Sequence, residues 1–151
     1  MTEKQKTYVK NSETDQVARA LLVWLNEYPE LPVGGIDYEY LSAEGESMAM
    51  SSIQSAYKTA EYIDGTYAAE YQFSIMYRIV PRMGSNSDRL FADETLNAIG
   101  DWASSRRPRP IIGTDKTVTG IRCNTRSTLL ARYEDGSEDH QILMTMNYEV
   151  N

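Results

Sequence analysis

One segment restricts the fold of this chain more than any other: between residues 69 and 80, apolar and polar side chains alternate almost without a break. A period of two residues is typical of a β-strand, because successive side chains point to opposite faces of a sheet. We therefore predict a long strand with one buried and one solvated face. The buried face comprises Ala69, Tyr71, Phe73, Ile75, Tyr77 and Ile79, and the solvated face comprises Glu70, Gln72, Ser74 and Arg78.

Two other segments have the spacing of amphipathic helices. The first begins at Ser12, which together with Asp15 resembles a capping box, and it ends near Pro29. The second is capped by Ser87 or Asp88. The apolar stripes are Val17, Leu21, Trp24, Leu25 and Tyr28 in the first helix, and Leu90, Phe91, Leu96, Ile99 and Trp102 or Ala103 in the second, which ends near Ser104.

Shorter strands surround these elements. Residues 36–40 and 48–51 alternate on either side of a Glu-Gly-Glu turn at 44–46, which predicts an antiparallel hairpin. Residues 55–65 match neither the two-residue period of a strand nor the spacing of an amphipathic helix, and they are interpreted as a loop or a short strand. The last third of the chain predicts strands at residues 117–123, 127–134 and 141–150.

The last two of these strands form a predicted hairpin. The Asp-Gly pair at 135–136 favours a two-residue turn. In that register Arg132 faces Asp139, and Leu129 faces Ile142. The final strand would bury Ile142, Met144, Met146, Tyr148 and Val150.

The order of the elements predicts an α+β fold: a mostly antiparallel sheet with two main helices packed on one face. A length of 151 residues, 41% of them hydrophobic, fits one globular domain at residues 13–151, preceded by a flexible polar arm at residues 1–12. The longest apolar stretch, residues 20–25, is far shorter than the roughly 20 residues that span a bilayer. We expect no membrane contact and, because residues 1–10 lack the apolar centre of a secretory signal, a location in the cytoplasm.

The sequence has few residues that could support chemistry. Cys123 and His140 are the only cysteine and histidine, which excludes an intrachain disulfide and any multi-thiolate or multi-histidine metal site. We therefore expect no catalytic residue, cofactor or metal. His140 is interpreted as a partly exposed strand residue. The acidic cluster beside it lacks the spacing of an EF-hand loop and is interpreted as a solvated hairpin turn; its members are Glu134, Asp135, Glu138 and Asp139.

The distribution of charge favours self-assembly. Residues 1–70 carry a net charge of −7, residues 71–133 of +5 and residues 134–151 of −5. A total of −7 argues against a general nucleic-acid binder, whereas unlike segments suit a protein whose copies meet through complementary surfaces. The content of 11 Tyr and 7 Met also suits protein interfaces.

The order of these patterns resembles the tail terminator proteins of long-tailed bacteriophages, which are often labelled minor capsid proteins in phages of Gram-positive hosts. The resemblance covers roughly residues 14–150. It is carried by the helix QVARALLVWLNEY, the strand AAEYQFSIMYRIV, the helix RLFADETLNAIGDWAS and the closing hairpin STLLARYEDGSEDHQILMTMNYEV.

The resemblance implies a structural virion protein rather than an enzyme. Members of the family form a ring, usually hexameric, on the last ring of the tail tube, where they stop tube polymerisation and present their other face to head-completion proteins. By position, the contact loops correspond to residues 29–35, 55–66, 81–86 and 105–114. The candidate subunit or partner contacts are Arg82, Met83, Arg106, Arg107, Arg109, Glu134, Asp135 and Asp139. Genomic DNA would only pass through the ring, so we expect acidic residues, and not the three arginines at 106–109, to line the channel.

Two alternatives belong to other classes. Another head-tail connector, a stopper or adaptor, would share the partners but differ in ring size, and a twelve-fold ring would favour it. A small α+β cone-type enzyme would instead place an acid with a perturbed pKa in a deep apolar cavity.

Overall fold

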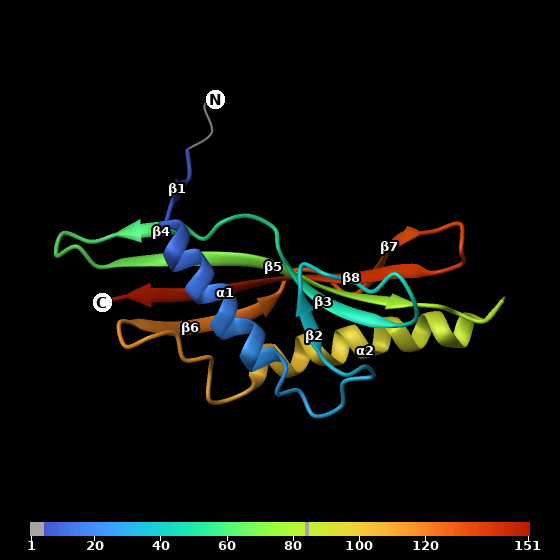
Figure 1. Ribbon diagram of the computed structural model, residues 1–151. Helices are drawn as coiled ribbons and strands as arrows, with labels where there is room; N and C mark the ends of the chain where they lie inside the picture. The colour runs from blue at the N-terminus through green and yellow to red at the C-terminus, as the bar shows by residue number, and fades with distance from the viewer. Residues whose placement is uncertain (1–4, 84) are drawn as a thin grey trace.

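Two long antiparallel strands form the centre of the protein. The computed structural model describes residues 5–83 and 85–151. Within it, β5 (Tyr67–Ile79) and β8 (Glu138–Val150) each have 13 residues and pair along their whole length, from Tyr67 opposite Val150 to Ile79 opposite Glu138. Figure 1 shows the two strands crossing the whole sheet side by side.

Short strands extend the sheet on both sides of this pair. Beyond β5, β4 (Tyr57–Glu61) pairs with its first half and β3 (Ser47–Ser52) with its second half. The outermost strands on that side are β1 (Thr7–Tyr8) against β4 and β2 (Ile36–Tyr38) against β3. Beyond β8 lie β6 (Lys116–Cys123) and β7 (Thr128–Arg132), giving eight strands in one sheet.

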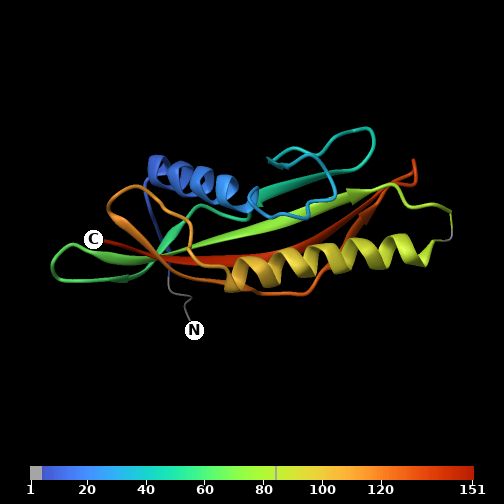
Figure 2. The ribbon, with the colours of Figure 1, turned by 90° about the horizontal axis from the view of Figure 1, so that it is seen from below.

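Both helices contribute to one hydrophobic core, which confirms the predicted α+β class. The helices are α1 (Asn11–Leu25) and α2 (Asn86–Ser105), and Figures 1 and 2 show α2 running beside the long strands. All six side chains of β5 that alternation predicts to face the core are buried, and so are four of the five in β8, whereas the fifth, Val150, is partly buried. The buried ones are Ala69, Tyr71, Phe73, Ile75, Tyr77, Ile79, Ile142, Met144, Met146 and Tyr148. Trp24 of α1 and Trp102 of α2 meet with their ring centroids 4.9 Å apart.

The opposite face of β5 is less solvated than predicted. Glu70 and Ser74 are buried. The Glu70 carboxylate accepts hydrogen bonds from the Tyr57 hydroxyl of β4 and from the Arg122 guanidinium of β6. Side chains from neighbouring strands therefore cover polar residues that alternation alone assigns to water.

The two helix starts differ from their predicted caps. α1 begins at Asn11 after Lys10, which makes no side-chain cap, so the capping box at Ser12 and Asp15 is wrong. Glu13 of the first turn instead accepts hydrogen bonds from Tyr67 and Tyr148, which lie on the long strands. These contacts hold the first turn of α1 against the long strands.

α2 starts earlier than predicted. It begins at Asn86, and the Ser85 hydroxyl caps it by accepting the backbone N–H of Asp88 at 3.1 Å. The predicted caps Ser87 and Asp88 are wrong, because Asp88 lies within the first turn and its carboxylate binds Arg82.

The polar arm is part of the domain from its first described residues. Thr7 and Tyr8 pair with Lys58 and Tyr57 of β4, and Val9 is buried. The prediction of a flexible arm over residues 1–12 is therefore wrong for residues 7–9 and also for residues 11 and 12, which begin α1. Residues 1–4 lie outside the described part. The unpaired edge of β4 supplies the hydrogen-bonding partner that a local pattern cannot reveal.

β2 and β3 pair in parallel, so the predicted antiparallel hairpin at residues 36–51 is wrong. Ile36 lies opposite Met48, and Tyr38 opposite Met50. Glu39 has a positive φ of 56° and binds Ser51 and Ser52 through its carboxylate. The following loop returns the chain to the start of β2 before β3 begins.

The β7–β8 hairpin exists, but its predicted register is wrong. Arg132 faces Glu138, and Leu129 faces His140. The turn has three residues, because the Tyr133 N–H donates to the Ser137 carbonyl at 2.9 Å and Gly136 has a φ of 89°. A bulge between Leu129 and Ala131 shifts the register again.

Gly100 of α2 gives a test of this packing. A Cβ at this position would lie 2.3 Å from the Cys123 sulfur of β6, so Gly100→Ala should destabilise the protein by about 1–3 kcal/mol, although alanine favours helices. Chemical denaturation measures the effect when the chain with Gly100 and the chain with Gly100→Ala are compared, once with Cys123 present and once in a Cys123→Ala background. We expect a smaller loss in the Cys123→Ala background; equal losses would contradict the close contact.

Candidate subunit-contact surfaces

A buried cluster of charges lies at the β7 end of the core. The Glu138 side chain, 1% exposed, accepts hydrogen bonds from Arg132 at 2.8 Å and from Arg89 of α2 at 2.9 Å. Burial alone would raise the pKa of Glu138, but the hydrogen bonds from Arg132, Arg89 and His140 outweigh it and lower this pKa below its ordinary value. Glu138 is therefore held in its ionised form.

His140 is buried inside this cluster. Its ring is 3% exposed, with Nδ1 2.9 Å from Asp93 Oδ1 and Nε2 3.3 Å from Glu138 Oε1. The imidazole therefore bridges a carboxylate of α2 and a carboxylate of β8. The prediction of a partly exposed strand residue is wrong, because α2 supplies Asp93 and covers the ring. The Ser127 hydroxyl donates to Asp93 at 2.7 Å and not to the imidazole, so these residues lack the order of a hydrolytic triad.

Asp139 lies on the opposite face and is also buried. Arg78 donates to its two carboxylate oxygens at 2.7 and 2.9 Å, and the Tyr133 hydroxyl donates at 2.7 Å. Burial favours the neutral acid, yet the hydrogen bonds from Arg78 and Tyr133 lower the pKa of Asp139. The prediction of a solvated acidic turn is correct only for Glu134 and Asp135, because the strand register places Asp139 opposite Arg78.

Two of the three candidate arginines after α2 are anchored within the subunit. We call residues 106–111 the Arg-Pro loop. The Arg106 guanidinium lies 4.7 Å from the Trp102 ring centroid and 5.5 Å from that of Trp24, and it pairs with Glu27 at 2.7 Å. Arg109 donates to the Ala103 carbonyl in the last turn of α2 at 3.1 Å. These contacts hold the loop in place.

The β5–α2 connection presents an exposed apolar residue beside a positive charge. Met83 is fully exposed. The neighbouring Arg82 pairs with Asp88 through both carboxylate oxygens, at 3.0 and 3.1 Å. Other exposed apolar side chains on the elements of this end are Val80, Leu90, Phe91, Leu129 and Leu130.

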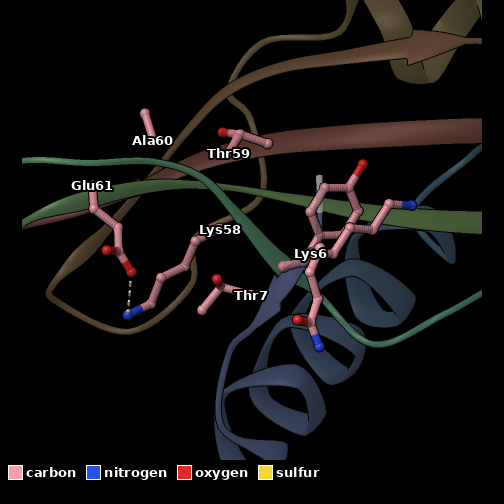
Figure 3. A pocket seen from close by; sticks show the side chains of 8 residues that line it. Lys6, Thr7, Lys58, Thr59, Ala60 and Glu61 are labelled. Carbon is pink, nitrogen blue, oxygen red and sulfur yellow. Dashed lines mark ion pairs between the residues drawn. The ribbon is translucent and has the colours of Figure 1, made fainter. Parts of the chain in front are cut away.

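The turn of the β4–β5 hairpin presents apolar residues at the other end of β5. Ile63 is fully exposed and Tyr62 is half-exposed, with Glu61 before them and Asp64 after them. We call residues 61–64 the hairpin tip. At its base, a shallow surface hollow of about 440 Å³ lies between β1 and β4. Figure 3 shows Lys58 and Glu61 beside this hollow, joined by an ion pair of 3.2 Å.

A groove of about 500 Å³ lies between α1 and the Arg-Pro loop. Its apolar lining includes Val23 and Ile111, which are 64% and 82% exposed. Arg19, Arg106 and Arg109 also line it. The sequence placed contacts in the Arg-Pro loop but missed the exposed face of α1 opposite, because the helical stripe marks only the side that faces the core.

Within the described ranges 5–83 and 85–151, no group of three or more His, Cys, Asp or Glu residues is arranged to hold a metal ion. In the same part of the chain, no helix is long and apolar enough to cross a membrane. Comparison of the sequence with protein-family models and with curated proteins gives no match.

The buried Glu138 predicts a pH-dependent stability. A lowered pKa in the folded state means that ionised Glu138 stabilises the fold above the ordinary value of 4.5, and that this contribution is lost as the pH falls through the lowered value. We expect the Tm to fall below about pH 4.5, and Glu138→Gln to lose about 1–3 kcal/mol at pH 7 and to show a shallower acid dependence.

Thermal unfolding followed by circular dichroism between pH 3 and 7 measures both effects. Glu134→Gln is the matched control, because Glu134 is exposed on the same hairpin, and its stability should stay within about 0.5 kcal/mol of the wild type. If the stability of Glu138→Gln depended on acid as steeply as that of the wild type, the acid dependence could not be assigned to Glu138.

Proposed function

We propose that the protein is a tail terminator of a long-tailed bacteriophage. Its copies would form a ring, usually six-membered in this family, at the head-proximal end of the tail tube. The ring would stop tube polymerisation and bind the head-completion proteins. The protein would then reside in the virion, at the head-tail junction, after assembly in the host cytoplasm.

One observation carries the proposal: fully exposed apolar side chains protrude at both ends of a rigid strand. Ile63 precedes β5 and Met83 follows it. At about 3.3 Å per residue, the 13 residues of β5 separate these ends by roughly 40 Å. We interpret the two protruding residues as contact sites, and unlike contact sites on one subunit generate head-to-tail rings or filaments.

The chemistry of the buried acids favours a structural role over a cone-type enzyme. A general acid in such an enzyme needs a pKa raised by burial. Hydrogen bonds outweigh burial at Glu70, Glu138 and Asp139 and lower the pKa of each; the donors are Tyr57 and Arg122 for Glu70, arginines and His140 for Glu138, and Arg78 and Tyr133 for Asp139. Partners within the fold thus hold these three acids in the charged form at neutral pH.

The test combines light scattering over a concentration series with negative-stain electron microscopy, with and without purified tail-tube protein. We expect hexameric rings, or a monomer that forms rings on tube ends. Tubes grown with the protein present should be shorter than tubes grown before it is added. A monomer that leaves tube ends bare would contradict the proposal, and a twelve-fold ring would favour an adaptor.

The assembled ring also tests the proposed channel. Arg106 and Arg109 are held against α1 and α2, so we expect them to lie away from the DNA path. An electron-microscopy map of the ring in which Arg106, Arg107 and Arg109 line the lumen would overturn this part of the proposal.

A further inference from the structure

We propose that the hairpin tip of one copy, residues 61–64, docks into the groove between α1 and the Arg-Pro loop of the next copy. This inference rests on the proposed ring and names the two surfaces that meet in it. The occupant of the groove is therefore a second copy of this chain.

The hairpin tip has the form of a preformed apolar knob. Ile63 is fully exposed at its end. The turn is fixed by backbone hydrogen bonds between Tyr62 and Thr66 at 2.9 Å and between Gly65 and Tyr62 at 3.1 Å. Asp64 accepts two further hydrogen bonds from Thr66. A rigid turn loses little conformational entropy when it binds.

The groove is equally preformed. The Trp24 indole of α1 donates to the Pro108 carbonyl at 3.1 Å, and Arg106 pairs with Glu27 at 2.7 Å, so both walls are tied together. The groove is open to solvent, and its volume of about 500 Å³ gives room for the side chains of a turn. Val23 and Ile111 offer apolar surface where Ile63 would enter.

The charges around the two surfaces are complementary. Glu61 and Asp64 flank the apolar knob, with Lys58 at its base. Arg19, Arg106 and Arg109 line the groove against one acid, Glu27, which leaves it positive.

The other protruding residue does not fit the groove electrostatically. Met83 is as exposed as Ile63, but the neighbouring Arg82 pairs with Asp88, so this connection offers no excess negative charge to the arginines of the groove. The hairpin tip is therefore the better occupant.

The knob and the groove lie on different elements, so the contact is heterologous and each copy offers one of each. A four-residue tip covers less than the roughly 800 Å² per partner of a stable interface. We therefore expect weak association in free solution and strong association on a tube end, where neighbouring copies are held close together.

Disulfide trapping tests the contact directly. In a Cys123→Ala background, the full chain carrying Ile63→Cys and Val23→Cys is oxidised on tube ends and separated on a non-reducing gel. We expect a ladder of covalent oligomers up to the ring size. The matched control carries Met83→Cys and Val23→Cys, and should give less than one tenth of that ladder.

The outcomes separate this inference from the proposed function. Three results would overturn the knob-and-groove contact alone. They are wild-type rings without a ladder from the Ile63→Cys and Val23→Cys chain, an equal ladder from the Met83→Cys control, and cross-linking of Val23→Cys to the tube protein. A wild-type chain that forms no ring overturns both proposals.

A second experiment depends on the head-to-tail geometry. Ile63→Lys replaces the apolar knob with a charge that the arginines of the groove repel, and Val23→Asp places an acid in the groove that repels Glu61 and Asp64 of the tip, so we expect each variant to lose ring formation while keeping the wild-type circular dichroism spectrum. Mixed together, they retain one intact junction, the wild-type tip of the Val23→Asp copy in the wild-type groove of the other copy. Over a series of rising concentrations, light scattering should find heterodimers and nothing larger. Rings formed by either variant alone would overturn the proposal.

Discussion

The pairing of β5 with β8 is the constraint on which the rest of the structure depends. Thirteen residues of each strand pair without interruption, and both strands turn an apolar face toward the helices. Because side chains alternate with a period of two, a slip of one residue in β5 would turn Phe73 and the other apolar side chains of β5 to the face opposite Met144 and its neighbours in β8. The short flanking strands and both helices can form only where this pair leaves an edge or an apolar face.

Buried charges fix the register at one end of the pair. Arg78 of β5 lies opposite Asp139 of β8 and binds it through two hydrogen bonds, while Glu138 on the other face binds Arg89 and Arg132. Buried ion pairs contribute little net stability compared with apolar packing, but separating one leaves a charge without its partner. The apolar core therefore supplies most of the stability, and these pairs oppose alternative registers.

The same long strands carry the features that support assembly. They hold the hairpin tip at one end and Met83 at the other, while α1 and the Arg-Pro loop form a groove beside them. In the proposed ring, these unlike surfaces would let each copy bind the next through a repeated contact.

Local periodicity by itself determined the long strands, both helices, the apolar core residues and the exposed loops. These follow from the spacing of apolar side chains along a short stretch of chain. The tertiary structure alone decided the direction of β2 against β3, the three-residue turn and bulge beside β8, and the burial of Asp139 and His140. It also formed the groove between α1 and the Arg-Pro loop. The two walls meet where Trp24 binds Pro108, and these residues are more than 80 positions apart in the sequence. The physical reason is that these features depend on partners distant in sequence, and a periodic pattern reports only which side of an element avoids water.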